Sequence, residues 1–148
     1  MKTIVRRATL DDLPWLLKEL EQFSTFALTR RPLFDPAVTP DVVRGLIERF
    51  VFFVAERGSE LQGLACGMLG PHFLNPTIKV FSEVLWWVPE SHRGGRAGLL
   101  LLEELTRYGR EHADWVVMTL EALSPVNDNC LRKRGYLLRE RSYVLEVS

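Results

Sequence analysis

The 148-residue sequence predicts a single α/β domain whose mixed, twisted central sheet is flanked by helices. Segments with strand and helix periodicity alternate in the order β-α-α-β-β-β-α-β-α-β, without a repeat or linker between them. The length is that of one ordinary domain with one sizeable core. An apolar strand at 80–88 also runs through a short glycine- and arginine-rich turn into a leucine-rich helix.

Strands are expected where apolar, β-branched and aromatic residues cluster between turn residues. A turn at 57–60 joins two of them as a hairpin, and a loop at 71–76 precedes the central strand. The predicted strands span residues 3–7, 51–56, 61–69, 80–88 and 115–120, with one or two closing strands in 136–147.

Helix starts are marked by capping residues. Thr9 and Asp12 resemble a capping box with Asp in place of Glu, and leucines at helical spacing follow them. Thr39 is expected to cap the second helix, with Pro40 at its first helical position. The predicted helices span residues 11–23, 40–49, 98–112 and 127–134, and residues 24–38 are predicted to form a loop or a broken helix.

Composition limits the class of protein. Hydrophobic residues make up 47% and charged residues 26%, which is typical of soluble globular proteins. The formal net charge is zero, so no nucleic-acid or membrane partner is expected, and no apolar run is long enough to span a bilayer. The two cysteines do not suggest a disulfide framework, and no signal peptide is visible. We therefore expect a cytoplasmic protein; a homodimer stays open.

The turn formed by residues 93–98 has the features of an anion site. Its glycines let the backbone approach a ligand, and the first turn of the following helix leaves N–H groups without intrahelical partners. Together with the helix dipole and the side chains of Arg93 and Arg96, these groups suit a pyrophosphate. The alternative is a plain strand-to-helix loop with solvated charges. The turn fits neither G-x-G-x-x-G nor a P-loop.

This turn resembles motif A of the GNAT N-acetyltransferases, Arg/Gln-x-x-Gly-x-Gly/Ala. Arg93 matches its first position and Gly98 its last, whereas Arg96 stands where the family usually has its middle glycine. Residues 131–136 resemble motif B through Lys133 and Gly135, and the element order extends the resemblance over essentially the whole chain.

The resemblance implies a GNAT-like fold and transfer of an acetyl group from acetyl-CoA to a primary amine. It also implies that backbone N–H groups of the turn bind the pyrophosphate and that the preceding strand pairs with the pantetheine arm. The cofactor-binding residues implied in this way are Trp87, Val88, Arg93, Gly94, Gly95, Arg96, Ala97, Gly98 and Asn127.

Glu83 is the candidate general base. It is the one carboxylate in an apolar strand whose neighbours suggest burial on both faces, and burial would raise its pKa. Several GNATs place a catalytic glutamate on this strand, and a base of that kind suits an ammonium acceptor near neutral pH. The alternative is a solvent-facing position on a half-exposed strand.

Leu131 departs from the family pattern, which often has a tyrosine there as general acid. Leucine cannot donate a proton. Either the thiolate leaves without an acid or another group donates, with Cys130, Ser124 and Tyr143 as nearby candidates. The departure also favours a catalytically silent acyl-CoA-binding domain, and Arg96 favours a structural or interaction protein with this fold.

The remaining residues suggest packing or surface roles. The three histidines show no metal-ligand spacing, Cys66 is expected to pack within a strand, and Trp86 and Trp87 should point to opposite faces of the sheet. The acceptor pocket is expected between residues 24–38 and 71–79. Its apolar walls are suggested by Phe23, Phe26, Phe34 and Phe73.

Overall fold

A computed structural model describes residues 1–26 and 29–147 of the chain. A five-stranded sheet forms its centre, with the strands in the order β1-β2-β3-β4-β5. Neighbouring strands are antiparallel except β4 and β5, which are parallel, so the sheet is mixed as predicted. The strands are β1 (Thr3–Arg7), β2 (Val51–Arg57), β3 (Glu60–Pro71), β4 (Lys79–Trp87) and β5 (Trp115–Val117).

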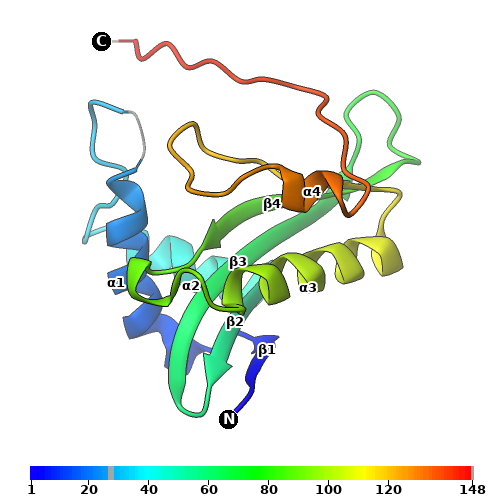
Figure 1. Cartoon of the computed structure of the whole chain (residues 1–148). Coiled ribbons are helices and arrows are strands. Elements are labelled where there is room, and N and C mark those ends of the chain that lie inside the picture. Colours follow the sequence, from blue (N-terminus) through cyan, green and yellow to red (C-terminus); the bar gives the residue numbers. More distant parts are fainter. Residues whose placement is uncertain (27–28, 148) are drawn as a thin grey trace.

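Helices cover both faces of this sheet (Figure 1). On one face, Leu16, Leu20 and Val43 of the first two helices pack on the inward side chains of β2 and β3. On the other face, Leu101 and Leu105 of the third helix pack against Phe53 and Phe81 and their neighbours. The α-helices are α1 (Leu13–Ser24), α2 (Thr39–Arg49), α3 (Ala97–His112) and α4 (Asn129–Arg132), and short 3-10 turns occur at Leu10–Asp12 and Glu90–His92.

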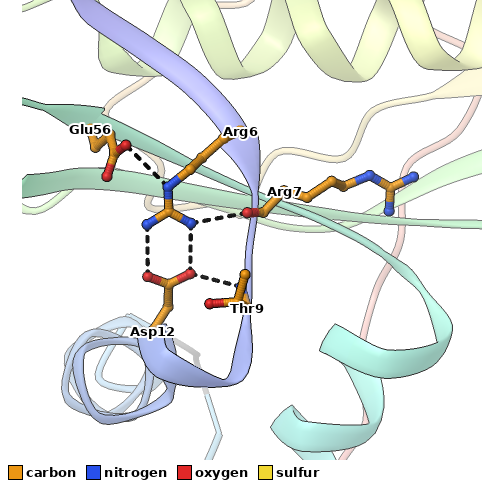
Figure 2. Close-up of polar contacts among 5 residues, drawn as sticks. All are labelled: Arg6, Arg7, Thr9, Asp12 and Glu56. Atoms are coloured by element: carbon orange, nitrogen blue, oxygen red, sulfur yellow. Dashed lines mark hydrogen bonds and ion pairs between the residues drawn. The ribbon is translucent and has the colours of Figure 1, made fainter.

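The start of the first helical segment is fixed by a buried carboxylate, as the predicted capping box requires. Asp12 accepts the backbone N–H of Thr9 at 2.8 Å and two hydrogen bonds from the guanidinium of Arg6 at 2.9 Å each (Figure 2). The Nε of Arg6 lies 3.1 Å from a carboxylate oxygen of Glu56 on β2. The Arg6 guanidinium holds the pKa of Asp12 below its ordinary value. This network joins β1, β2 and the entry to α1.

Element boundaries differ from prediction by a few residues at most positions. Thr39 does not cap α2 from outside; it is the first helical residue, and its hydroxyl accepts the N–H of Asp35 at 2.9 Å. The fifth strand and the fourth helix are shorter than predicted, because β5 ends at Val117 and α4 spans four residues.

The predicted closing strands in residues 136–147 are wrong. That segment is irregular up to residue 147 and runs past α4 without joining the sheet (Figure 1). After the half-buried Tyr136, its apolar side chains lie in solvent, with Tyr143 88% and Leu145 86% exposed. The alternation supplies strand propensity, but a strand also needs a neighbouring edge with which to exchange hydrogen bonds. The three-residue β5 is too short an edge to support them.

Candidate functional site

The centre of the candidate site is the place where β4 and β5 part. The two strands pair only from Val80 to Ser82 on β4 and from Trp115 to Val117 on β5. Beyond Ser82, β4 continues to Trp87 with a partner on its β3 side alone. One backbone edge of β4 is therefore left without a sheet partner along the cleft.

A β-bulge lies at this point of divergence. Gly67 of β3 pairs with Glu83, but the next residue back, Cys66, pairs with Leu85, so Val84 is the extra residue on β4. A bulge bends its strand and increases the local twist, and bulges are frequent next to active sites. Here it accompanies the separation of β4 from β5 and leaves Val84 41% exposed.

The carboxylate of Glu83 reaches across the gap between the two strands. Its Oε2 accepts the backbone N–H of Thr119, just beyond the end of β5, at 3.3 Å. Burial raises the pKa of Glu83 from its ordinary value of 4.5 to about 7. The Thr119 hydrogen bond opposes this rise, and the nearby negative charge of Glu121 adds to it. A carboxylate with this pKa can both hold and release a proton near neutral pH.

Residues 93–98, which we call the glycine turn, present backbone N–H groups beside this carboxylate strand. Within the described part of the chain, the N–H groups of Gly94, Arg96, Ala97 and Gly98 have no hydrogen-bond acceptor. The first intrahelical bond of α3 runs from Leu100 to Arg96 at 3.0 Å. Unpaired N–H groups at the start of a 16-residue helix are groups that can bind an anion.

Gly94 has a specific conformational role in the glycine turn. Its φ of +87° lies in the left-handed region that favours glycine. At the other end of the turn, the carbonyl of Gly98 accepts the indole N–H of Trp86 at 3.1 Å, which fixes the first turn of α3 on β4.

The two adjacent tryptophans serve opposite faces of the sheet, as predicted. Trp86 packs with the α3 cluster, whereas Trp87 is 8% exposed and belongs to the α1/α2 cluster. The indole N–H of Trp87 donates to the buried carboxylate of Glu19 on α1 at 3.1 Å. Phe23 and Phe26 contact the Trp87 ring edge-on, with centroids 5.7 and 5.2 Å away. We call Phe23, Phe26 and Trp87 the aromatic wall.

A cleft of about 540 Å³ joins these features. It is lined by the aromatic wall, Glu83, most of the glycine turn and the segment that follows β5. Of the predicted cofactor-binding residues, the following line it: Trp87, Val88, Arg93, Gly94, Gly95, Gly98 and Asn127. Arg96 is exposed outside the cleft and Ala97 is buried beneath the turn.

The guanidinium of Arg93 contacts the aromatic wall. Its Nε donates to the carbonyl of Val88 at 3.0 Å. Its central carbon lies 4.9 Å from the ring centroid of Trp87 and 5.6 Å from that of Phe26. The side chain thus extends from the glycine turn to the aromatic wall, and the groups that the turn offers to an anion are its backbone N–H groups.

The candidate proton donors separate into two groups. Ser124 and Cys130 line the cleft. Tyr143 is almost fully exposed in the C-terminal segment and does not line it. Leu131, the residue at the tyrosine position of the family pattern, is half-buried, does not line the cleft, and follows Cys130, which does.

The structure brings only some of the residues expected around the acceptor to the cleft. Phe23 and Phe26 line the cleft, but Phe34 does not, and Phe73 is 92% exposed and stacks on His72. No residue of 71–79 lines the cleft. That loop lies against Trp115 instead, through a contact of His72 with the indole ring at 5.0 Å.

Three residues with clear contacts to the site were not predicted. Glu19 carries no sequence signal, because nothing in the sequence of α1 distinguishes it from Glu21, the other acidic residue of that helix. Thr119 contributes only its backbone N–H, which any residue has. Glu121 lines the cleft, and its place after a strand with predicted bounds 115–120 could have identified it.

The described residues were also compared with what a membrane-spanning protein and a metal site would require. No helix within residues 1–26 and 29–147 combines the length and apolar character needed to cross a bilayer. In the same ranges, no three His, Cys, Asp or Glu side chains lie together as a metal site would require. Cys66 is fully buried in the core, and burial raises its thiol pKa to about 12, which fits packing.

No protein-family model and no curated protein matches this chain. Solved structures do match it along its whole length. An acetyltransferase from Trypanosoma brucei is 22% identical with a TM-score of 0.74, and covers 99% of this chain and 100% of its own. A predicted acetyltransferase from Clostridium acetobutylicum, solved with acetyl-CoA, is 16% identical with a TM-score of 0.71, over 98% of this chain and 96% of its own.

A transcriptional regulator from Bacillus halodurans C-125 is also similar, with 15% identity, a TM-score of 0.78, and coverage of 99% and 100% of the two chains. Several further structures with this fold are named acetyltransferases. At these identities the likeness establishes the fold. The sheet order, the helices on both faces and these full-length matches together give the chain the fold of the GNAT acetyltransferases.

Proposed function

We propose that this protein is an acetyl-CoA-dependent N-acetyltransferase that acts on a primary amine. The observation that carries the proposal is the arrangement of the cleft. Gly94 and Gly98, whose N–H groups are unpaired, line the same cavity as Glu83, and so does the part of β4 that has no partner on the β5 side. The acetyltransferases that share this fold support the same activity.

In this proposal, the glycine turn binds the pyrophosphate of acetyl-CoA through the unpaired N–H groups of Gly94, Arg96, Ala97 and Gly98, beside Asn127. Gly95, whose N–H bonds to the carbonyl of His92 at 3.4 Å, lets the backbone approach the ligand. The free edge of β4 at Trp87 and Val88 pairs with the pantetheine arm as an added strand. The protein requires no resident metal or cofactor for this chemistry.

Glu83 acts as the general base. It takes a proton from the acceptor ammonium, directly or through a water, and the neutral amine attacks the thioester carbonyl carbon. The C–N bond forms as the C–S bond breaks, CoA leaves as a thiolate, and the nitrogen loses its second proton, which in the overall balance goes to that thiolate. That thiolate needs little assistance, since thiols have pKa values of about 8 to 9. Cys130 and Ser124 line the cleft and are candidate proton donors.

The test is turnover of an amine panel by the wild type and by Glu83→Gln, with acetyl-CoA binding measured separately by calorimetry. Glutamine keeps the size of the side chain and can still accept the Thr119 N–H, but it cannot take a proton. The rate should fall by about 10²- to 10⁴-fold while acetyl-CoA affinity stays nearly unchanged. Wild-type turnover in Glu83→Gln would show that this carboxylate is structural.

Leu131 favours a second candidate, a catalytically silent acyl-CoA-binding domain, because it removes the tyrosine that related enzymes often use as an acid. Binding of acetyl-CoA without acetyl transfer to any amine of the panel would favour this candidate. Absence of binding would favour a structural or interaction protein. We place the enzyme in the cytoplasm, in keeping with two cysteines that form no disulfide among the described residues.

A further inference from the structure

The side chain of Arg93 extends from the glycine turn to the aromatic wall and makes three contacts. Its Nε donates to the Val88 carbonyl, and its guanidinium lies over the rings of Trp87 and Phe26. A planar guanidinium suits all three contacts, because it can donate in its plane while its face stacks on an aromatic ring.

The aromatic wall is held firmly from its other side. Trp87 is buried and its N–H donates to Glu19, which is itself 8% exposed. Phe26 has no such anchor. It follows the end of α1, where its own N–H bonds to the carbonyl of Phe23 at 3.0 Å, and its ring contacts only Trp87 and Arg93 among the aromatic and cationic groups of the described residues.

The backbone of Arg93 is in turn fixed at the start of the glycine turn. Its N–H bonds to the carbonyl of Glu90 at 3.2 Å, and the unpaired N–H groups begin at the next residue, Gly94. An anion held by those N–H groups would therefore restrain the residue from which the guanidinium projects. A restraint on Arg93 passes to Phe26 without any intervening residue.

We propose that Arg93 is a positioning residue that couples the glycine turn to the aromatic wall, so that acetyl-CoA bound at the turn orders the side of the cleft formed by Phe26. The inference rests on the proposed function. In this proposal the side chain of Arg93 acts on the aromatic wall, through Phe26 and Trp87, and does not act as a ligand of the phosphate. Arg96, the other arginine of the turn, is exposed and touches neither ring.

Amide hydrogen exchange tests this coupling without a known acceptor. The reporters are the N–H groups of Thr25 and Phe26, which bond to Gln22 and Phe23 at 3.1 and 3.0 Å. Saturating CoA should slow their exchange by about fivefold or more in the wild type, because coupling between sites typically changes equilibria by at least that factor. In Arg93→Gln at saturating CoA the slowing should fall below about twofold.

Two variants make the result specific. Arg93→Lys keeps a cation that can lie over Trp87 but loses the planar fork, so it should retain part of the slowing. Arg44→Gln is the matched control; it removes an exposed positive charge from α2, outside the cleft lining, and at saturating CoA the two reporters should slow as they do in the wild type. Exchange at the buried strand β2 checks that each variant remains folded.

The outcomes separate this inference from the proposed function. If calorimetry detects no binding of CoA to the wild type, the proposed function itself is refuted. Binding of CoA with no slowing at Thr25 and Phe26 in the wild type refutes the coupling, as does full slowing in Arg93→Gln. If Arg93→Gln does not fold, Phe26→Leu is made instead, both in the wild type and in Arg93→Lys. If the effects of Phe26→Leu and Arg93→Lys on exchange simply add, the coupling is refuted.

An acceptor found in the amine panel supplies a kinetic readout. Arg93→Lys should raise the KM for the amine by about tenfold while the Kd for acetyl-CoA changes by less than about threefold. If the KM for the amine and the Kd for acetyl-CoA rise equally, or if only the Kd rises, Arg93 serves the cofactor and not the aromatic wall.

Discussion

Glu83 should make this protein less stable as the pH rises, and Glu83→Gln should remove that dependence. The folded protein raises the pKa of Glu83 from 4.5 to about 7, mainly by burial. The unfolded chain therefore loses this proton at a lower pH than the folded chain does. Between these two pKa values each rise in pH favours the unfolded state, and above about 7 the effect is constant.

The difference between the two pKa values sets the magnitude. One pH unit corresponds to about 1.4 kcal/mol, so Glu83 should lower the free energy of unfolding by about 3 kcal/mol once it is ionised in both states. That is a large part of the typical stability of a domain, about 5 to 15 kcal/mol.

Urea unfolding of the wild type and Glu83→Gln at several values between about pH 5 and pH 8 measures the effect. Other titrating groups are common to both proteins, so their contributions cancel in the difference. Glu83→Gln should gain about 2 to 3 kcal/mol relative to the wild type across this range. Glu140→Gln, which changes an exposed carboxylate, is the control and should gain nothing. Parallel pH profiles for wild type and Glu83→Gln would refute a desolvated Glu83.

Three further outcomes are expected. Gly98→Val should weaken CoA binding in calorimetry by about tenfold or more, because a branched side chain there hinders approach to the N–H groups, and unchanged affinity in a folded variant would sink the anion-site assignment. If Cys130 donates the proton to the leaving thiolate, Cys130→Ala should slow acetyl transfer by about tenfold or more and shift the high-pH limb of the rate profile. Leu131→Tyr in that variant should restore part of the rate. Wild-type kinetics in Cys130→Ala would show that the CoA thiolate leaves without an acid or receives its proton from another donor. Asp12→Asn should lose about 1 to 2 kcal/mol in urea unfolding near neutral pH, since it breaks the paired hydrogen bonds from Arg6, whose side chain is one-third exposed. The pKa of Asp12 is lowered in the folded state, so that loss should shrink as the pH falls below 3.8, and a constant difference would contradict it.

Local patterns predicted most of the fold because most elements carry their own signal. The helices around Leu16 and Leu101 have apolar residues at helical spacing, and the hairpin of β2 and β3 has turn residues between two apolar runs. Order and approximate bounds follow from such signals alone. The C-terminal segment shows the limit, since its alternation predicts a strand but cannot supply the edge on which a strand depends.

The site was predicted in part for the same reason. The glycine turn is contiguous in sequence, so its composition identifies it. The environment of Glu83 is not local: it depends on a backbone N–H 36 residues away and on a bulge that changes the side-chain alternation at Val84. The place of the Arg93 side chain depends on rings brought from α1 by folding. Residue types alone therefore suggested a phosphate ligand and could not predict the contact of Arg93 with the aromatic rings.

The extra residue in β4 has a consequence for which changes of length this strand can accept. Strand side chains alternate with a period of two, and Val84 shifts that period by one, so Phe81 and Trp86 serve one face while Leu85 and Trp87 serve the other. Deletion of Val84 alone would restore unbroken alternation and keep each tryptophan on its present face, because Phe81 and Trp86 would then be four positions apart. Each indole could keep its acceptor, Gly98 or Glu19, but the bend of β4 at the bulge would be lost. Loss of a second residue between Glu83 and Trp87 would exchange the two tryptophans between the α1 and α3 layers. This strand should therefore accept a change of the Val84 side chain, and the loss of one residue should affect its bend before it affects its packing.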